Sequence, residues 1–275
     1  MPNFEEHIDR YFASLKDCEL TKAMKYAMEG GKRIRPRITF ALLEDMGIDI
    51  EKGFDASLAL EMIQTYSLIH DDLPAMDNDD MRRGKPSLHK AFREDIAILA
   101  GDQLLTGSFG VIASSSAYDP LCRNKMIDYL SRFAGLDGMV YGQLLDVTTD
   151  CNKIDEDMLF EIEDNKTGGL FKIACLNAMC INNEENEEFY IGLGSRIGRI
   201  FQMQDDLIDV LRSEKETGKS SSDLANEKGT ALSLHSVNDL QEIIAKEFDA
   251  LDAYLKDASF NAFAIKKLLE QMSRR

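Results

Sequence analysis

The sequence has little of what breaks helices or builds sheets. Its five prolines all lie at or before Pro120, so the last 155 residues contain none of the residue that interrupts a helix. Strand-like alternation of apolar and polar residues is scarce, and no Asn-Gly or Asp-Gly turn is flanked by it. There is no low-complexity linker and no short-period repeat. These absences favour a single all-α domain over residues 1–275.

Positive charge, paired cysteines and long apolar runs are also lacking. Acidic residues outnumber basic ones by 49 to 32, and the net charge of −17 argues against nucleic acid as a partner. The five cysteines form no C-x-x-C motif, which indicates free thiols in a reducing compartment, and the four histidines are too scattered for a zinc site. No apolar run reaches the roughly 18 residues that span a bilayer, and the N-terminus does not resemble a signal peptide. We therefore expect a cytoplasmic protein without a membrane span.

What the sequence does contain is a dense acidic cluster in residues 67–85, SLIHDDLPAMDNDDMRRGK. Pro74 disfavours helical geometry at the residue before it, so the preceding apolar helix should end at Asp72. Asp71 and Asp72 would then lie at a helix C-terminus, where the helix dipole disfavours anions. Mg²⁺ binds carboxylates together with substrate phosphates and is the cation that this arrangement favours. A chance Asp-Asp pair in an acidic protein is the alternative interpretation.

A second acidic cluster lies in residues 201–211, FQMQDDLIDVL, within a segment whose apolar spacing predicts a helix over 186–212. Asp205 and Asp209 would share one face of that helix, one turn apart, with Asp206 beside them. Like charges at this spacing are destabilising unless a cation lies between them. Two such clusters, each at the end of an apolar helical segment, indicate a divalent-ion site more strongly than one cluster does.

Basic and polar segments complete the pattern. EGGKRIRPR, residues 29–37, is a glycine turn followed by Lys32 and Arg35, and taken alone it is a basic turn of a kind found on many surfaces. Residues 212–230 form a polar interruption in which Gly218 and three serines break the helical pattern. Composition alone favours a solvated loop there.

Together these motifs resemble those of the short-chain trans-polyprenyl diphosphate synthases of the bacterial farnesyl diphosphate synthase type. DDLPAMD followed by RRG resembles the first aspartate-rich motif of that family, and FQMQDDLID resembles the second. The resemblance runs from about residue 29 to residue 231. It implies an all-α bundle of the isoprenoid synthase type with a central cavity, commonly assembled as a homodimer. It also implies Mg²⁺-dependent condensation of isopentenyl diphosphate with dimethylallyl or geranyl diphosphate to give farnesyl diphosphate, with Mn²⁺ as an alternative metal.

The resemblance assigns roles to individual residues. The implied metal ligands are Asp71, Asp72, Asp77, Asp205, Asp206 and Asp209. The implied ligands of isopentenyl diphosphate are Lys32, Arg35 and Arg83, with Gln64 where many bacterial relatives have a histidine. The implied ligands of the allylic diphosphate are Arg82, Lys166 and two lysines of a closing lid, Lys219 and Lys228. Near Lys228 the chain reads NEKGTA, which departs from the family's more usual G-K-S/T-T run.

The resemblance also concerns three further polar side chains near the implied site. The Thr167 hydroxyl and the Gln202 side-chain carbonyl would face the developing carbocation. Gln143, in GMVYGQLLD, either reaches the metal or allylic site or is a buried structural amide.

Gly194 and Gly198 lie four residues apart in a predicted helix, which indicates close contact with another helix.

Tyr66 is the candidate determinant of product length. It lies five positions before Asp71, about 7.5 Å along a helix axis, where a ring could close the floor of a hydrocarbon tunnel. A plain core aromatic is the alternative interpretation of Tyr66.

The competing functions are a geranylgeranyl diphosphate synthase, a class I terpene cyclase, a non-catalytic subunit of a longer-chain synthase, and an acidic helical divalent-ion binder. The basic residues argue against the last of these, and the complete second acidic motif argues against the cyclase and the subunit.

Overall fold

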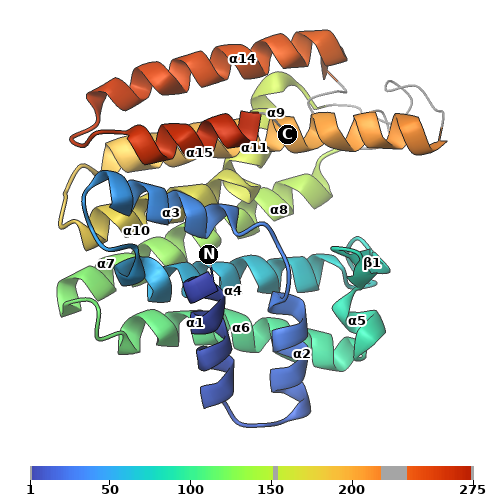
Figure 1. Cartoon of the computed structure of the whole chain (residues 1–275). Coiled ribbons are helices and arrows are strands. Elements are labelled where there is room, and N and C mark those ends of the chain that lie inside the picture. Colours follow the sequence, from blue (N-terminus) through green and yellow to red (C-terminus); the bar gives the residue numbers. More distant parts are fainter. Residues whose placement is uncertain (1, 151–153, 218–233, 274–275) are drawn as a thin grey trace.

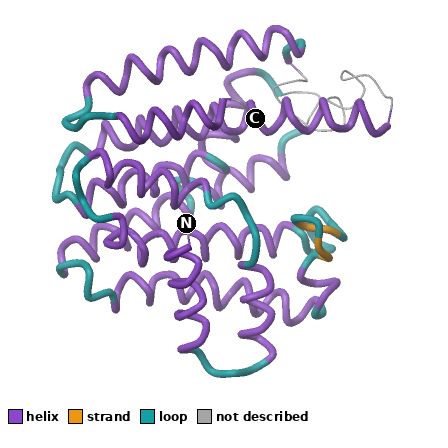
Figure 2. The backbone as a smooth tube through the Cα atoms, in the orientation of Figure 1, coloured by secondary structure: helices purple, strands orange, loops and turns teal. Residues whose placement is uncertain are grey.

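Helices make up nearly all the regular structure in the computed structural model, which describes residues 2–150, 154–217 and 234–273 (Figures 1 and 2). The first half contains α1 (Pro2–Ser14), α2 (Glu19–Met28), α3 (Ile34–Asp45), η1 (Ile50–Gly53), α4 (Phe54–Asp71), α5 (Leu88–Ala91), α6 (Glu94–Ser114) and α7 (Pro120–Ala134). The second half contains α8 (Met139–Thr148), α9 (Glu156–Lys166), α10 (Gly168–Ile181), α11 (Glu187–Thr217), α14 (Val237–Tyr254), η3 (Leu255–Asp257) and α15 (Phe263–Ser273). The predicted all-α fold is confirmed.

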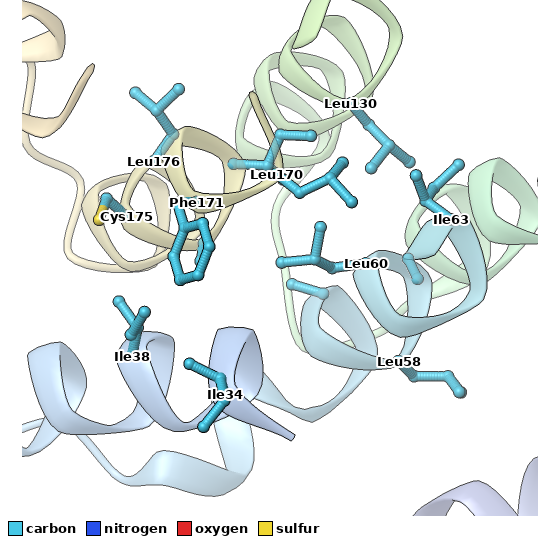
Figure 3. Close-up of a cluster of buried hydrophobic side chains, with 14 of the residues drawn as sticks. Ile34, Ile38, Leu58, Leu60, Ile63, Leu130, Leu170, Phe171, Cys175 and Leu176 are labelled. Atoms are coloured by element: carbon cyan, nitrogen blue, oxygen red, sulfur yellow. The ribbon is translucent and has the colours of Figure 1, made fainter. Parts of the chain in front are cut away.

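Two helices form the centre of the bundle. Every residue from Gly168 to Cys180 in α10 is buried, and α4 is buried along most of its length. α4 packs along α6, and α10 packs against both α11 and α3. Figure 3 shows the meeting point, where apolar side chains of α3, α4, α7 and α10 converge, among them Ile38, Leu60, Leu130 and Phe171. The ends of α4, α10 and α11 are thereby fixed relative to one another.

Glycines let α10 and α11 approach closely. A Cβ added at Gly194 would lie 2.4 Å from the Cα of Lys172, and one added at Gly198 would lie 2.8 Å from the Cα of Gly168. Neither position has room for a side chain, because the atoms in the way are backbone. The predicted close helix–helix contact at these two glycines is confirmed.

The one sheet among the described residues was not predicted. β1 (Met81–Arg82) and β2 (Lys85–Pro86) form a two-residue antiparallel hairpin. Its turn residues, Arg83 and Gly84, have φ angles of 54° and 74°, the left-handed pair that a tight hairpin requires. The hairpin turns at Arg-Gly rather than at Asn-Gly or Asp-Gly, and no alternation of apolar and polar residues flanks it, so the sequence carries no strong hairpin signal here.

The C-terminus of α4 lies where the sequence predicts it, at the first acidic motif. The C-terminus of α11, after the second acidic motif, lies beyond its predicted position. α4 ends at Asp71, with Asp72 as its C-cap, as Pro74 predicted. α11 continues to Thr217, so residues 212–217, which were expected to belong to a loop, are helical. Residues 212–217 contain Arg, Glu and Lys, which have good helix propensity, and Gly218 is the first strong breaker. Lys219 and Lys228 lie outside the described residues.

One described helix, α6, is long and apolar enough, by length and composition only, to cross a membrane. Its sequence is not an uninterrupted apolar run, because Asp102 and Gln103 lie in its middle. Core helices of globular bundles meet the same criterion, and α6 packs along α4.

Candidate active site

A cavity of about 640 Å³ opens among α3, α4, α8, α11 and the end of α9. Ten of the residues predicted from the sequence line it, namely Lys32, Arg35, Gln64, Tyr66, Asp71, Arg83, Lys166, Thr167, Gln202 and Asp205. Gln143 lines it as well. These residues come from segments far apart in the chain, so the fold gathers basic, acidic and apolar side chains around one space.

The glycine turn joins the two basic motifs. Gly30 and Gly31 have φ angles of 75° and 103°, in the region that favours glycine. A Cβ at Gly31 would lie 3.1 Å from the guanidinium carbon of Arg83, and Arg83 donates a hydrogen bond to the carbonyl oxygen of Gly30 across 3.3 Å. Arg83 therefore lies directly against the turn, and this contact brings it beside the segment that carries Lys32 and Arg35.

Arg35 is a buried cation with unused hydrogen-bonding capacity. Its guanidinium lies 4.7 Å from the centre of the Phe171 ring, and its buried Nε has no hydrogen-bond partner in the described part of the chain. The pKa of Arg35 is lowered to about 10, mainly by burial and also by nearby Arg83, against the opposing charges of Glu61 and Asp205. A buried guanidinium in this state has much to gain from an anionic ligand.

Arg33, in the same basic turn, has a different role. It adopts a φ of 48°, and its side chain turns inward to donate hydrogen bonds to Glu61 across 2.7 Å and to Glu5 across 2.9 Å. It also donates to the carbonyl oxygen of Met28. Arg33 thus connects α1, α2 and α4, and it lines the cavity together with its neighbours Lys32 and Arg35.

The first acidic motif places one carboxylate in the cavity. The pKa of Asp71 is raised to about 6, mainly by burial and also by Asp77 and Asp72, against the opposing charges of Lys166 and Arg82. The backbone N–H of Asp77 donates to the carbonyl oxygen of Asp71 across 2.8 Å, which folds the motif back on the helix end. Negative charge is therefore concentrated where the helix dipole gives it no support.

Asp72 and Arg82 are engaged with each other and line a smaller neighbouring pocket. Arg82 donates through Nε across 2.9 Å and through Nη2 to the same carboxylate oxygen of Asp72, which is almost fully buried. Arg82 also donates to Asp79 across 3.2 Å. Neither residue is among those lining the large cavity, although the resemblance assigned both to its ligands.

The junction of α9 and α10 carries the next polar group of the site. Lys166 donates to Asp146 of α8 across 2.6 Å. Gly142 makes this approach possible, because a Cβ there would lie 2.1 Å from the backbone nitrogen of Lys166. Asp146 was not predicted; its place in GMVYGQLLD, four residues after Gly142 and hence one helical turn on, was the available signal.

The second acidic motif is tied to this junction by a hydrogen-bond chain. The Thr167 hydroxyl donates to the side-chain carbonyl of Gln202 across 2.9 Å, and the Gln202 amide donates to Asp206 across 2.9 Å. Asp206 is buried, and Asp205 lines the cavity. These two hydrogen bonds orient the Gln202 carbonyl toward Thr167. Asp209 belongs to α11, but its side chain lies outside the described part.

Donor chemistry and charge fit a hard divalent cation. Asp71 and Asp205, one from each acidic motif, line the same cavity. Within the described ranges no three His, Cys, Asp or Glu side chains are already gathered as a metal-binding group. Carboxylate oxygens are what Mg²⁺ takes from proteins, alongside phosphate oxygens and water. The raised pKa of Asp71 shows negative charge that a bound cation would stabilise.

Part of the cavity wall is apolar. It is formed by Leu68, Met139, Val140 and Phe201, with Tyr66 on α4 among them. Tyr66 is buried, and its ring centre lies 5.8 Å from that of His70. The cavity therefore has a charged part near Asp71 and a hydrocarbon-like part beside it.

Comparison with known proteins agrees with this geometry. Residues 17–272 match the family model described as polyprenyl synthetase. The chain is 37% identical to the farnesyl diphosphate synthase of Geobacillus stearothermophilus over 282 residues, which covers 98% of this chain and 94% of that protein. It is 36% identical to geranylgeranyl pyrophosphate synthase 7 of Arabidopsis thaliana, over 96% of this chain and 78% of the relative. Its structure is similar to that of a geranyltransferase from Legionella pneumophila, with a TM-score of 0.85, 31% identity and coverage of 100% and 94% of the two chains.

Proposed function

The chain belongs to the polyprenyl synthetase family and is a prenyltransferase that elongates isoprenoid diphosphates; we propose that it condenses isopentenyl diphosphate with dimethylallyl or geranyl diphosphate to give farnesyl diphosphate (C15). One observation carries the proposal. A single cavity is lined by basic side chains, by a carboxylate from each acidic motif and by an apolar wall that includes Tyr66. Each part of a prenyl diphosphate, and the metal that its leaving group requires, finds a matching surface there.

The diphosphate of isopentenyl diphosphate would bind at Lys32, Arg35 and Arg83. The support is the buried, unsatisfied Nε of Arg35 and the contact that draws Arg83 against the glycine turn. A guanidinium presents a planar fork to phosphate oxygens, while Lys32 contributes a point charge. The buried Oε1 of Gln64 and Nε2 of Gln143 also lack partners among the described residues. Their amides would donate to or accept from ligand and water in the same space.

Enzymes of this family generally use Mg²⁺. In this chain Asp71 and Asp205 would hold it, together with Asp72, Asp77, Asp206 and Asp209, with Mn²⁺ as an alternative. Held there, a divalent cation would supply positive charge to neutralise the leaving diphosphate of the allylic substrate. Lys166 and Arg82 would add hydrogen-bond donors to the same leaving group. Lys219 and Lys228 would do so from the polar segment outside the described residues.

Loss of diphosphate leaves an allylic cation beside neutral dipoles. The Thr167 hydroxyl oxygen and the Gln202 carbonyl are the groups that would stabilise it, and their mutual hydrogen bond fixes their directions. The double bond of isopentenyl diphosphate then attacks the cation, a carbon–carbon bond forms, and a proton is lost. Because no cavity side chain stands out as a base, the departed diphosphate is the group to which we assign that proton.

Product length would be limited by Tyr66. The geranylgeranyl relatives make a C20 product the second candidate, and the bulk of the Tyr66 ring in the apolar wall favours C15. A terpene cyclase or a simple ion binder would leave the cluster of Lys32, Arg35 and Arg83 without a substrate.

The chain would act as a homodimer in the cytoplasm. An exposed apolar stripe is formed by Leu144 and Val147 of α8 and by Leu136 in the turn just before it. Burying such a stripe between two copies would stabilise a dimer. The four cysteines in the described part, Cys18, Cys122, Cys175 and Cys180, are free thiols, as a reducing compartment would keep them.

One incubation tests the proposed function. Labelled isopentenyl diphosphate is supplied with dimethylallyl or geranyl diphosphate and Mg²⁺, and the products are separated by chain length. Farnesyl diphosphate as the main product from both starters is expected. A main product of C20 would replace the proposed function by its alternative, and absence of any condensation would refute the assignment of this site.

A further inference from the structure

The His70 imidazole occupies a notch in the neighbouring helix. His70 is the residue before Asp71 on α4, and its ring lies against α6 at Gly101. A Cβ added at Gly101 would lie 2.1 Å from Nε2 and 2.6 Å from Cδ2 of His70. The same Nε2 lies 3.2 Å from the carbonyl oxygen of Ile98, one helical turn before that notch, so an N–H there donates to α6. The ring fits because position 101 has no side chain.

His70 in turn contacts Tyr66. The two residues are four apart on α4 and share one side of the helix. Their ring centres are 5.8 Å apart with an interplanar angle of 77°, an edge-to-face arrangement that aromatic pairs favour. Both side chains line the cavity. A chain of contacts therefore runs from the backbone of α6 through His70 to the ring in the apolar wall.

We propose that His70 and Gly101 are positioning residues for product length, because they hold the Tyr66 ring across the apolar end of the cavity. This inference rests on the proposed function, in which Tyr66 forms the floor. Side chains on helices choose between two common χ1 rotamers, and a neighbouring ring one turn away selects between them. Without the support of His70, the Tyr66 ring has room to swing aside, and a longer hydrocarbon can pass.

A purely structural role makes a different prediction. If His70 and Gly101 only hold α4 against α6, a change at either position lowers stability and leaves the ratio of products unchanged. The product ratio is the readout that separates the two roles, because it compares two reactions of the same folded molecules.

The experiment uses His70→Ala, Gly101→Ala and Tyr66→Ala, each alone, and the first two also combined with Tyr66→Ala. Gly110→Ala is the matched control, since it lies on the same helix and a Cβ there would meet nothing within 4 Å. Labelled isopentenyl diphosphate, geranyl diphosphate and Mg²⁺ are supplied, and the C20:C15 ratio is measured together with thermal unfolding. His70→Ala removes the ring and Gly101→Ala displaces it, so two independent routes test one contact.

We expect His70→Ala and Gly101→Ala each to raise the C20:C15 ratio by roughly threefold or more, a small change in relative barrier. Gly110→Ala should leave the ratio at the parental value. In the Tyr66→Ala background neither change should raise the ratio further, because both act through the Tyr66 ring. The inference is overturned if the C20:C15 ratio is unchanged or lower in both single variants. It is also overturned if either change raises the ratio as much in the Tyr66→Ala background as it does alone. Parental products from Tyr66→Ala itself would instead refute the floor on which the inference rests.

Discussion

Arg82 donates two hydrogen bonds to a single carboxylate oxygen of Asp72, one of them across 2.9 Å, and the pair closes the first acidic motif against its trailing basic hairpin. The resemblance to known synthases had assigned Asp72 to metal and Arg82 to diphosphate. Within SLIHDDLPAMDNDDMRRGK, the negative charge of Asp72 is therefore neutralised by the positive charge of Arg82. In the bound state Asp72 would pair with the metal and Arg82 with the diphosphate. The free-energy cost of separating Asp72 from Arg82 would then be part of the binding free energy.

Arg82→Lys should weaken binding of the allylic diphosphate. A lysine keeps the charge but offers one nitrogen, so it cannot reproduce the Nε and Nη2 contacts of the guanidinium. We expect KM for geranyl diphosphate to rise about tenfold, with KM for isopentenyl diphosphate changing little. Arg93→Lys is the control, because Arg93 makes a similar contact to Asp95 at an exposed position. Equal effects of the two changes would contradict the assignment.

Arg35→Met should show the opposite selectivity. The thioether side chain can still pack against Phe171 but removes the buried charge. Loss of a charged hydrogen bond, about 1.5–3 kcal/mol, should raise KM for isopentenyl diphosphate roughly ten- to a hundredfold. KM for the allylic partner should stay near the parental value. Arg37→Met, which loses a contact to Gln271 at the surface, serves as the comparison. Steady-state kinetics with each substrate varied in turn would show the difference, and an unchanged KM for isopentenyl diphosphate would refute the role.

The features that could be predicted from the sequence were those with a local cause. Helical character followed from apolar spacing and from the missing prolines, and the end of α4 followed from Pro74. The close approach of α10 and α11 followed from the spacing of Gly194 and Gly198. Each of these inferences needs only a few neighbouring residues and the geometry of a helix.

The features that could not be predicted depend on partners distant in the chain. Nothing local distinguishes Arg33, which pairs with Glu5 and Glu61, from Arg35, which lies on Phe171. The contact between Lys166 and Asp146 likewise joins two helices whose packing is set by the whole bundle. Motif resemblance pointed to ten residues that line the cavity and also to Asp72 and Arg82, which do not, because packing decides which side chains face the cavity.

Asp205→Ala should lose most of the turnover and keep the fold. Asp205, from the second acidic motif, lines the same cavity as Asp71 of the first. Loss of a group that stabilises the leaving diphosphate typically costs about a hundredfold or more in kcat. Circular dichroism should show parental helix content. Asp252→Ala, which breaks a surface pair with Lys266, is the matched control. Near-parental turnover of folded Asp205→Ala would exclude a metal role for this residue.

Tyr66→Ala should shift the product from C15 towards C20. Removing the ring lengthens the apolar part of the cavity on the α4 side, where Tyr66 is buried. Tyr66→Phe keeps the ring and should keep C15, which separates bulk from the hydroxyl group. Product chain length with labelled isopentenyl diphosphate is the measurement. If both variants yield the parental products, Tyr66 is an ordinary core aromatic.

Asp71→Asn should stabilise the metal-free protein while it abolishes efficient turnover. Burial raises the pKa of Asp71 from 3.8 to about 6, so the folded state binds a proton more tightly than the unfolded chain does. Between those two values the carboxylate therefore costs the folded state increasing free energy as pH rises, and above pH 6 the full cost remains. After a discount for partial solvent screening, we expect Asp71→Asn to gain about 1–2 kcal/mol of unfolding free energy at pH 7.5.

The gain from Asp71→Asn should disappear as pH falls. Below pH 3.8 the carboxyl is neutral in both states, so asparagine offers no advantage, and the two unfolding curves should converge as that value is approached. Urea unfolding in EDTA at several pH values would measure this. Asp252→Asn, at an exposed position, is the control and should not gain stability with rising pH. Saturating Mg²⁺ should stabilise the parent more than Asp71→Asn, since a ligand stabilises only the state that binds it. An advantage that is independent of pH would mean that charge burial at Asp71 is not its cause.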